Sequence, residues 1–544
     1  MTDFETSPER YTHWKLSIDG AVARLVMAVV EDKPQRPGYR LKLNSYDLGV
    51  DIELADAVQR LRFEHPEVKV VVVSSALGNV FCAGANIMML SSSTHPFKVN
   101  FCKYTNETRC SIEDAAAGSG QYWISACNGT ASGGGYELAL ACNEIVLVDD
   151  GNSAVSLPEV PLLGVLPGTG GLTRLVDKRR VRRDLADVFS TTAEGCKAKK
   201  ALDWKLIDAH FTRSKWEAGI NDRVAKALAK APSNKESAKG VKLGPIGGKF
   251  SDNKLEYKNV TVELDPASRL GTLTVKGPEE GPPSSVTALH EAGSESWFLR
   301  TMRELDDALC HLRFDHEEIG LLLVKSVGDI DKVVAWSDFL ADNKSDWLVN
   351  ETLLFTARVM RRLDNMAKSM FAIVEPGSAF GGVFFEMALS ADRVYMLNDA
   401  SRPVHFAISA LSDGLLPMTS GLTRLQARHY GNLEHASKLA KGRGKFDTDA
   451  AVEAGLVTVA PDEIDWEDDV RLAIEERVSL SPDSLTGMEA SLRHCGPESV
   501  DSKIYGRLTA WQNWIFTRPN ATGESGALKL YGQPERPKFD WRRT

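Results

Sequence analysis

The feature that most constrains this chain is an internal repeat that spans almost its whole length. Four segments of the first half return in the same order in the second half, each 249 to 251 residues later. The pairs are residues 54–68 with 305–319, 137–146 with 386–395, 171–175 with 421–425, and 201–207 with 451–457. Matches in one order at nearly constant spacing indicate two copies of one domain.

Within each copy, apolar segments that predict strands alternate with amphipathic segments that predict helices. Residues 52–61 have the helical pattern, for example, and residues 68–75 (VKVVVVSS) have that of a buried strand. Such alternation is typical of an α/β sheet covered by helices. We predict a first copy over residues 1–229, a linker rich in Lys, Gly and Ser over 230–256, a second copy over 257–471, and a helical, aromatic tail over 472–544.

Charge and targeting signals narrow the possible functions. Lys and Arg number 65 against 74 Asp and Glu, and a net charge of −9 disfavours a nucleic acid as partner. The N-terminus lacks the apolar run of a signal peptide, and the uncharged run 70–97 is broken by Gly, Asn, His and Pro. The eight cysteines form no CxxC and the 11 histidines no HxxxH, so we expect neither a disulfide framework nor a metal site. A cytoplasmic protein without membrane association is expected.

Three segments of the first copy carry residues suited to chemistry. Residues 81–87 (FCAGANI) form a turn of small residues after a predicted strand. Residues 128–140 place three glycines before an apolar helix that contains Glu137, and the free N–H groups of such a helix start can hold an oxyanion. Residues 157–171 put Glu159 in an apolar loop rich in Gly and Pro. Two glutamates beside backbone donors suit acid–base chemistry next to a polarised carbonyl.

Each glutamate also has a simpler interpretation. Glu137 could merely complement the dipole of its helix, and Glu159 could point into solvent. A run of three glycines is usually only a tight turn. The sequence of these segments leaves both interpretations open.

Together, the three segments resemble the enoyl-CoA hydratase/isomerase (crotonase) superfamily. The resemblance implies tandem crotonase-like spirals of ββα units and a substrate that is a CoA thioester, with no cofactor besides the CoA of the substrate. It also implies an oxyanion hole from the N–H groups of Ala85 and Gly134, with Glu137 and Glu159 as the acid–base pair. The substrate-binding positions that it implies are Lys42, Asn44 and Gly84.

The second copy keeps the pattern of strands and helices but lacks several of the residues proposed for catalysis. Trp336 stands where the first copy has Gly84, and Ser409 stands where it has Glu159. The three glycines become Gly-Gly-Val-Phe-Phe before Glu386, so side chains crowd the backbone site. We therefore expect a catalytic first copy and a degenerate second one.

Within the superfamily, the likeness is strongest to the ring-opening enzymes of aerobic benzoate degradation. It implies a lyase that opens 2,3-epoxybenzoyl-CoA by hydrolytic C–C cleavage, giving 3,4-dehydroadipyl-CoA semialdehyde and formate. Cys102 lies in the segment that would roof the acyl pocket, either as a packed thiol or as a polar helper at the ring.

Two other functions stay open. One is an enoyl-CoA hydratase or isomerase acting on linear acyl groups, and the other is a non-catalytic acyl-CoA-binding or assembly protein. Pure binding has no need of two carboxylates near a thioester, which disfavours the second. The resemblance also implies a homo-oligomer, such as a dimer.

Overall fold

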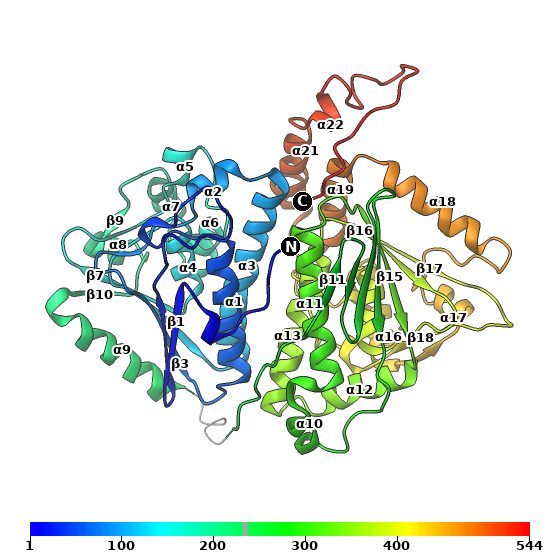
Figure 1. Cartoon of the computed structure of the whole chain (residues 1–544), viewed down its shortest axis with the longest axis horizontal. Helices are drawn as coiled ribbons and strands as arrows, with labels where there is room; N and C mark the ends of the chain where they lie inside the picture. Colours follow the sequence, from blue (N-terminus) through cyan, green and yellow to red (C-terminus); the bar gives the residue numbers. More distant parts are fainter. Residues whose placement is uncertain (232–237) are drawn as a thin grey trace. The chain divides into compact units, whose positions relative to one another are not determined.

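The computed structural model describes residues 1–231 and 238–544, and these form two compact units (Figure 1). One unit is Asp3–Leu243, and the other is Gly244–Thr544 together with Met1–Thr2. Residues 232–237 of the predicted linker lie outside the described residues. The rest of that linker includes two short strands, β11 (Lys249–Ser251) and β12 (Lys254–Glu256).

The main sheet of the N-terminal unit has the strand order β1-β2-β3-β5-β7-β10. A hairpin of β1 and β2 opens it, and each later strand runs parallel to its neighbour. The strands are β1 (Trp14–Asp19), β2 (Val22–Met27), β3 (Val70–Ser75), β5 (Tyr122–Cys127), β7 (Glu144–Asp149) and β10 (Ala209–Thr212). Apolar side chains of β3, β5 and β7 pack against α9 (Trp216–Lys230), which confirms the predicted helix-covered sheet.

A second, smaller sheet of this unit has the order β4-β6-β8-β9. Its strands are β4 (Val80–Cys82), β6 (Thr130–Ser132), β8 (Ala154–Ser156) and β9 (Cys196–Lys197). In the chain, β4, β6 and β8 follow the main strands β3, β5 and β7, so the turns after them are brought together. Each of these long strands is thus followed in the chain by a short strand of the second sheet.

Three helices of the N-terminal unit begin at a side-chain cap, and they are α1 (Leu48–Phe63), α2 (Ile87–Ser92) and α3 (His95–Gly118). Asp47 caps α1, Asn86 caps α2 and Thr94 caps α3, each accepting a hydrogen bond from a backbone N–H in the first turn. The other helices are α4 (Gly134–Ala141), α5 (Glu159–Leu163), α6 (Gly171–Thr173), α7 (Arg183–Ser190) and α8 (Ala198–Asp203).

The C-terminal unit has a sheet of order β11-β12-β13-β14-β15-β16-β17, in which β14 to β17 are parallel. Its further strands are β13 (Val260–Asp265), β14 (Leu270–Lys276), β15 (Leu321–Val327), β16 (Ser369–Val374), β17 (Arg393–Met396), β18 (Phe406–Ile408) and β19 (Gly444–Phe446). Its helices are α10 (Val286–Ala292), α11 (Trp297–Phe314), α12 (Ile330–Asp342), α13 (Trp347–Asp364), α14 (Gly382–Ser390), α15 (Arg424–Arg428), α16 (Leu433–Gly442), α17 (Thr448–Glu453), α18 (Trp466–Ser479), α19 (Pro482–Arg493), α20 (Val500–Lys503), α21 (Thr509–Ile515) and α22 (Pro519–Thr522).

The start of the predicted tail differs from the structure. The boundary between residues 471 and 472 falls inside α18, whose apolar face packs on β15 and β16. The first turn of α18 carries Glu467, Asp468 and Asp469, and these charges beside the apolar positions weaken the signal of that face in the sequence. Over the described residues, no helix combines the length and the apolar character needed to cross a membrane.

Candidate active site

Two backbone amides meet where the turn after β4 approaches the start of α4. Gly84 has a φ of +89°, and a Cβ there would lie 2.7 Å from the Ser132 carbonyl oxygen and 2.9 Å from the Gly134 nitrogen. Only glycine allows this approach. Within the described chain, no hydrogen bond occupies the N–H of Ala85 or of Gly134. The site therefore offers two adjacent free donors, as an oxyanion hole requires.

Glu137 lies in the first turn of α4 and is held by the loop before α6. Its Oε1 accepts hydrogen bonds from the N–H groups of Thr169 (2.9 Å) and Gly171 (2.8 Å), and its Oε2 accepts one from the Thr169 hydroxyl. The side chain is 2% exposed. Three donors on one carboxylate fix its orientation. A glutamate that only complemented the helix dipole would not need these hydrogen bonds. The Gly-Thr-Gly-Gly run at residues 168–171 is the sequence feature that could have indicated these hydrogen-bond donors.

Glu159 is the first residue of α5 and is buried without a matching set of donors. Its Oε2 has no hydrogen-bond partner in the described chain. Burial, and then the charge of Glu137, raise the pKa of Glu159 from 4.5 to about 7. A Cβ on Gly133 would lie 2.5 Å from Oε1, so the carboxyl sits directly against the glycine turn of the hole. The side chain does not point into solvent.

The two glutamates thus differ in what they can do. A carboxyl whose pKa is near 7 can give and take a proton at working pH. A carboxylate that already accepts three hydrogen bonds is instead suited to orienting a water or a substrate hydroxyl. The geometry combines such a pair with a main-chain donor site.

Comparison with known proteins identifies the family. A family model for enoyl-CoA hydratase/isomerase matches residues 35–241. The chain is 50% identical to the benzoyl-CoA-dihydrodiol lyase of Aromatoleum evansii over 545 residues, which cover 100% of this chain and 98% of that protein. The chain belongs to the crotonase superfamily. It is an enzyme, a lyase of that superfamily.

Solved structures also match about two fifths of the chain. An enoyl-CoA hydratase from Geobacillus kaustophilus HTA426 is 31% identical, covering 40% of this chain and 75% of that chain with a TM-score of 0.35. A putative enoyl-CoA hydratase from Thermobifida fusca YX in complex with CoA is 24% identical, covering 43% of this chain and 86% of that chain with a TM-score of 0.36.

Cys102 of this crotonase lies on α3, beside the loop that holds Glu137. A Cβ on Gly168 would lie 3.2 Å from its Sγ. Burial, and then the charge of Glu137, raise the pKa of Cys102 to about 11. The thiol is therefore neutral at working pH and can act as an S–H donor, but not as a thiolate nucleophile.

The two residues expected to hold the CoA end have different surroundings. Lys42 is exposed. Asn44 is buried, and its amide donates to Ser75 Oγ (2.8 Å) and the Phe81 carbonyl (3.1 Å) while accepting from the Val29 N–H (3.1 Å). These bonds tie the loop to the sheet. The geometry therefore favours a positioning role for Asn44 over the direct substrate contact that we predicted.

The C-terminal unit closes the positions that match the hole. The Val383 N–H, at the position of Gly134, donates to the Ser337 hydroxyl at 3.1 Å. Glu386 accepts from the Ser412 hydroxyl (2.6 Å) and lies 3.5 Å from the Arg424 guanidinium. The amide and the carboxylate are thus both engaged within the protein.

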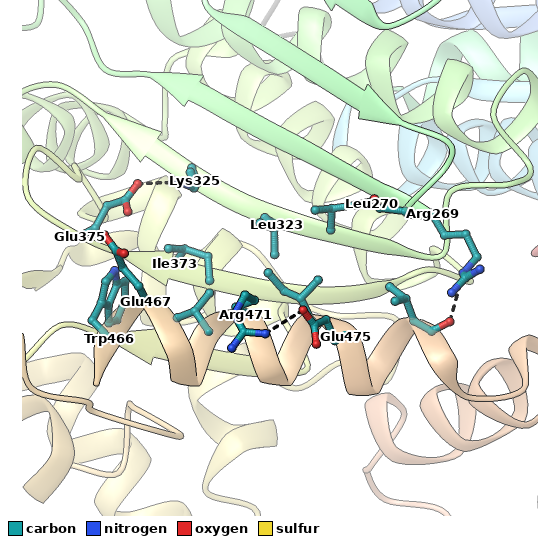
Figure 2. A pocket seen from close by; sticks show the side chains of 14 residues that line it. Arg269, Leu270, Leu323, Lys325, Ile373, Glu375, Trp466, Glu467, Arg471 and Glu475 are labelled. Atoms are coloured by element: carbon teal, nitrogen blue, oxygen red, sulfur yellow. Dashed lines mark hydrogen bonds and ion pairs between the residues drawn. The ribbon is translucent and has the colours of Figure 1, made fainter. Parts of the chain in front are cut away.

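A cavity of about 640 Å³ lies between α18 and the sheet of the C-terminal unit (Figure 2). Leu270, Leu323 and Ile373 line it from the sheet. Lys325 pairs with Glu375 at 2.7 Å, and Arg471 pairs with Glu475 at 2.9 Å, as Figure 2 shows. Since two of its three carboxylates are neutralised by cations, this cavity lacks the acid–base pair of the N-terminal site.

Proposed function

We propose that this crotonase opens the ring of 2,3-epoxybenzoyl-CoA, giving 3,4-dehydroadipyl-CoA semialdehyde and formate. The observation that carries the proposal is the 50% identity, over the full chain, to a benzoyl-CoA-dihydrodiol lyase. That likeness supports a related function in a benzoyl-CoA pathway, and the intact glutamate pair of the N-terminal unit supports turnover there.

The oxyanion hole supplies the electrostatic part of the mechanism. The N–H groups of Ala85 and Gly134 would bind the thioester oxygen and stabilise the negative charge pushed towards it from the ring. Stabilising this charge lowers the barrier to attack of water on the ring, because the thioester accepts the electrons that the attack pushes out of the ring. The amides are positioned before the substrate arrives, so little reorganisation is needed.

The glutamates supply the proton transfers. Glu159 would take a proton from the attacking water and return it to the oxygen that leaves carbon when the epoxide opens. Glu137 would hold the water in line. A second water adds before C–C scission, so that two waters balance the semialdehyde and formate. Cys102 would donate its S–H to an oxygen on the ring.

The C-terminal unit is best explained as a degenerate copy of the catalytic one. Its sheet also continues from a hairpin, β13 with β14, into parallel strands. The Arg174–Glu113 ion pair (2.8 Å) of the N-terminal unit has a counterpart in Arg424–Asp364 (2.6 Å). With the hole position closed by Ser337, this copy would serve structure and not turnover.

The remaining parts of the proposal concern partners. We propose an acyl-CoA as the substrate, held in part by Lys42, with no cofactor beyond the CoA that it carries. A homo-oligomer, such as a dimer, and a cytoplasmic location complete it. Neither nucleic acid nor membrane is proposed as a partner.

The test is product analysis. Purified enzyme is incubated with 2,3-epoxybenzoyl-CoA, benzoyl-CoA and crotonyl-CoA, and formate and CoA products are measured by mass spectrometry. Formate from the epoxide alone supports ring opening. Hydration of crotonyl-CoA without formate supports the linear enoyl-CoA alternative, and tight binding of the thioesters without any product supports a binding protein. The Glu159→Gln variant is the matched inactive control.

A further inference from the structure

A buried polar network lies behind the two amides of the oxyanion hole. Its members are Tyr46 before α1, Asp51 in α1 and Arg109 in α3, with exposed fractions of 1%, 0% and 1%. The Tyr46 hydroxyl donates to Asp51 Oδ1 at 2.6 Å, and the Thr108 hydroxyl donates to Asp51 Oδ2 at 2.6 Å. The Arg109 guanidinium lies 3.8 Å from Asp51 Oδ1.

This network reaches both halves of the hole. The Tyr46 N–H donates to the Gly84 carbonyl, and the Tyr46 carbonyl accepts from the Asn86 N–H, both at 2.8 Å. The Tyr46 backbone therefore brackets Ala85 on either side. From the other direction, Arg109 Nη2 donates to the Gly134 carbonyl at 2.9 Å. Asp51 is the group that joins the two halves, since it binds Tyr46 and faces Arg109.

Stability alone does not explain such a network. A buried ion pair often adds little stability compared with apolar residues of similar size. The same helix carries a second pair of this kind, in which Tyr11 donates to Asp56, and the C-terminal unit repeats it as Tyr257 with Asp307. That second pair is thus present in both units, whether or not a hole exists.

The network behind the hole has no such counterpart. The positions 251 residues after Tyr46 and Asp51 are Trp297 and Met302. One turn before Asp364, where the N-terminal unit has Arg109 one turn before Glu113, stands Met360. Met302 and Met360 are fully buried. Apolar residues therefore fill these positions in the unit whose hole is closed, and polar ones fill them where the hole is open.

We infer that Tyr46, Asp51 and Arg109 are positioning residues that hold the Ala85 and Gly134 amides in register as one oxyanion hole. The inference rests on the proposed function, because it assigns these residues to that site. Loosening either half moves a donor away from the thioester oxygen, and a misplacement of about 1 Å can cost about 10²-fold in rate.

The test compares Tyr46→Phe and Arg109→Met with Tyr11→Phe. The last variant removes the same kind of Tyr–Asp bond from α1 without touching the hole. We expect kcat for the epoxide to fall about 10-fold in Tyr46→Phe and about 10²-fold in Arg109→Met, with KM within about 2-fold of wild type, because the hole binds the transition state more than the substrate. Tyr11→Phe should keep the wild-type kcat.

An infrared measurement reports on the hole without turnover. Benzoyl-CoA with a ¹³C-labelled thioester carbonyl is bound to each variant, and the shift of its carbonyl stretch from the value in water is measured. We expect the same shift in wild type and Tyr11→Phe, and a smaller one in Tyr46→Phe and Arg109→Met. Equal shifts and equal kcat in Tyr46→Phe and Tyr11→Phe would overturn the inference. Failure of wild type to form formate would sink only the proposed reaction, since the infrared comparison stands apart from it.

Discussion

Replacing Glu159 by Gln should make the protein inactive and, above neutral pH, more stable. The carboxyl has a pKa of about 7 in the folded chain against an ordinary value of 4.5, because it is buried next to Glu137. Below pH 4.5 it is protonated in both the folded and the unfolded chain, and burial of its charge costs nothing. Between pH 4.5 and 7 the unfolded chain ionises first, so stability falls as the pH rises. Above pH 7 the full cost remains.

The size of that cost follows from the separation of the two pKa values. Each pH unit of separation is worth about 1.4 kcal/mol, so the ionised Glu159 costs up to about 3 kcal/mol above pH 7. Glutamine keeps the shape and never ionises. For a unit of this size, about 3 kcal/mol corresponds to a rise in melting temperature of roughly 6–12 °C at pH 8. At pH 4.5 the two proteins should melt together.

The assay is calorimetry of wild type and Glu159→Gln from pH 4.5 to 8, with Glu137→Gln as the matched control. Glu137 accepts three hydrogen bonds, so at pH 8 its replacement weakens charge-assisted bonds worth about 1–2 kcal/mol. The replacement also removes the charge that helps to raise the pKa of Glu159, which offsets part of this loss. We therefore expect that Glu137→Gln does not raise the melting temperature at pH 8 as Glu159→Gln does. If Glu159→Gln melts at or below the wild-type temperature at pH 8, the carboxyl is not a buried, unpaired acid and the reasoning fails.

Three further outcomes are expected. Gly84→Ala should lower kcat about 10²-fold in steady-state kinetics, since a Cβ would press 2.7 Å from the Ser132 carbonyl and displace the hole; near-normal kcat would show that the turn adapts. Iodoacetamide should inactivate the enzyme slowly at pH 7.5, because burial raises the pKa of Cys102 to about 11 and leaves it as a thiol; rapid loss of activity that Cys102→Ala abolishes would contradict this. Glu386→Gln should keep turnover within about 2-fold of wild type, because proton transfer is assigned to the other unit, and a large loss of kcat in a folded variant would place chemistry in the C-terminal unit.

The sequence alone indicated the repeat and the α/β class, and it supplied the residues that we propose for the site. Runs of apolar residues predict the strands directly. Glycine is the residue that permits the left-handed φ and the close approach at Gly84, so this turn can also be predicted from the local sequence. The positions of Glu137 and Glu159 next to glycine-rich turns came from the same local signals.

Only the tertiary structure decided what each glutamate can do. Thr169 and Gly171 lie more than 30 residues from Glu137 in the chain, yet their donors fix its carboxylate, while Glu159 is buried with an unpartnered oxygen. Whether a carboxyl is a proton carrier depends on burial and on partners brought together by the fold, and neither is encoded next to the residue. The same holds for Asn44, which we expected to bind substrate: its hydrogen bonds to Ser75 and Phe81 became visible only in the fold.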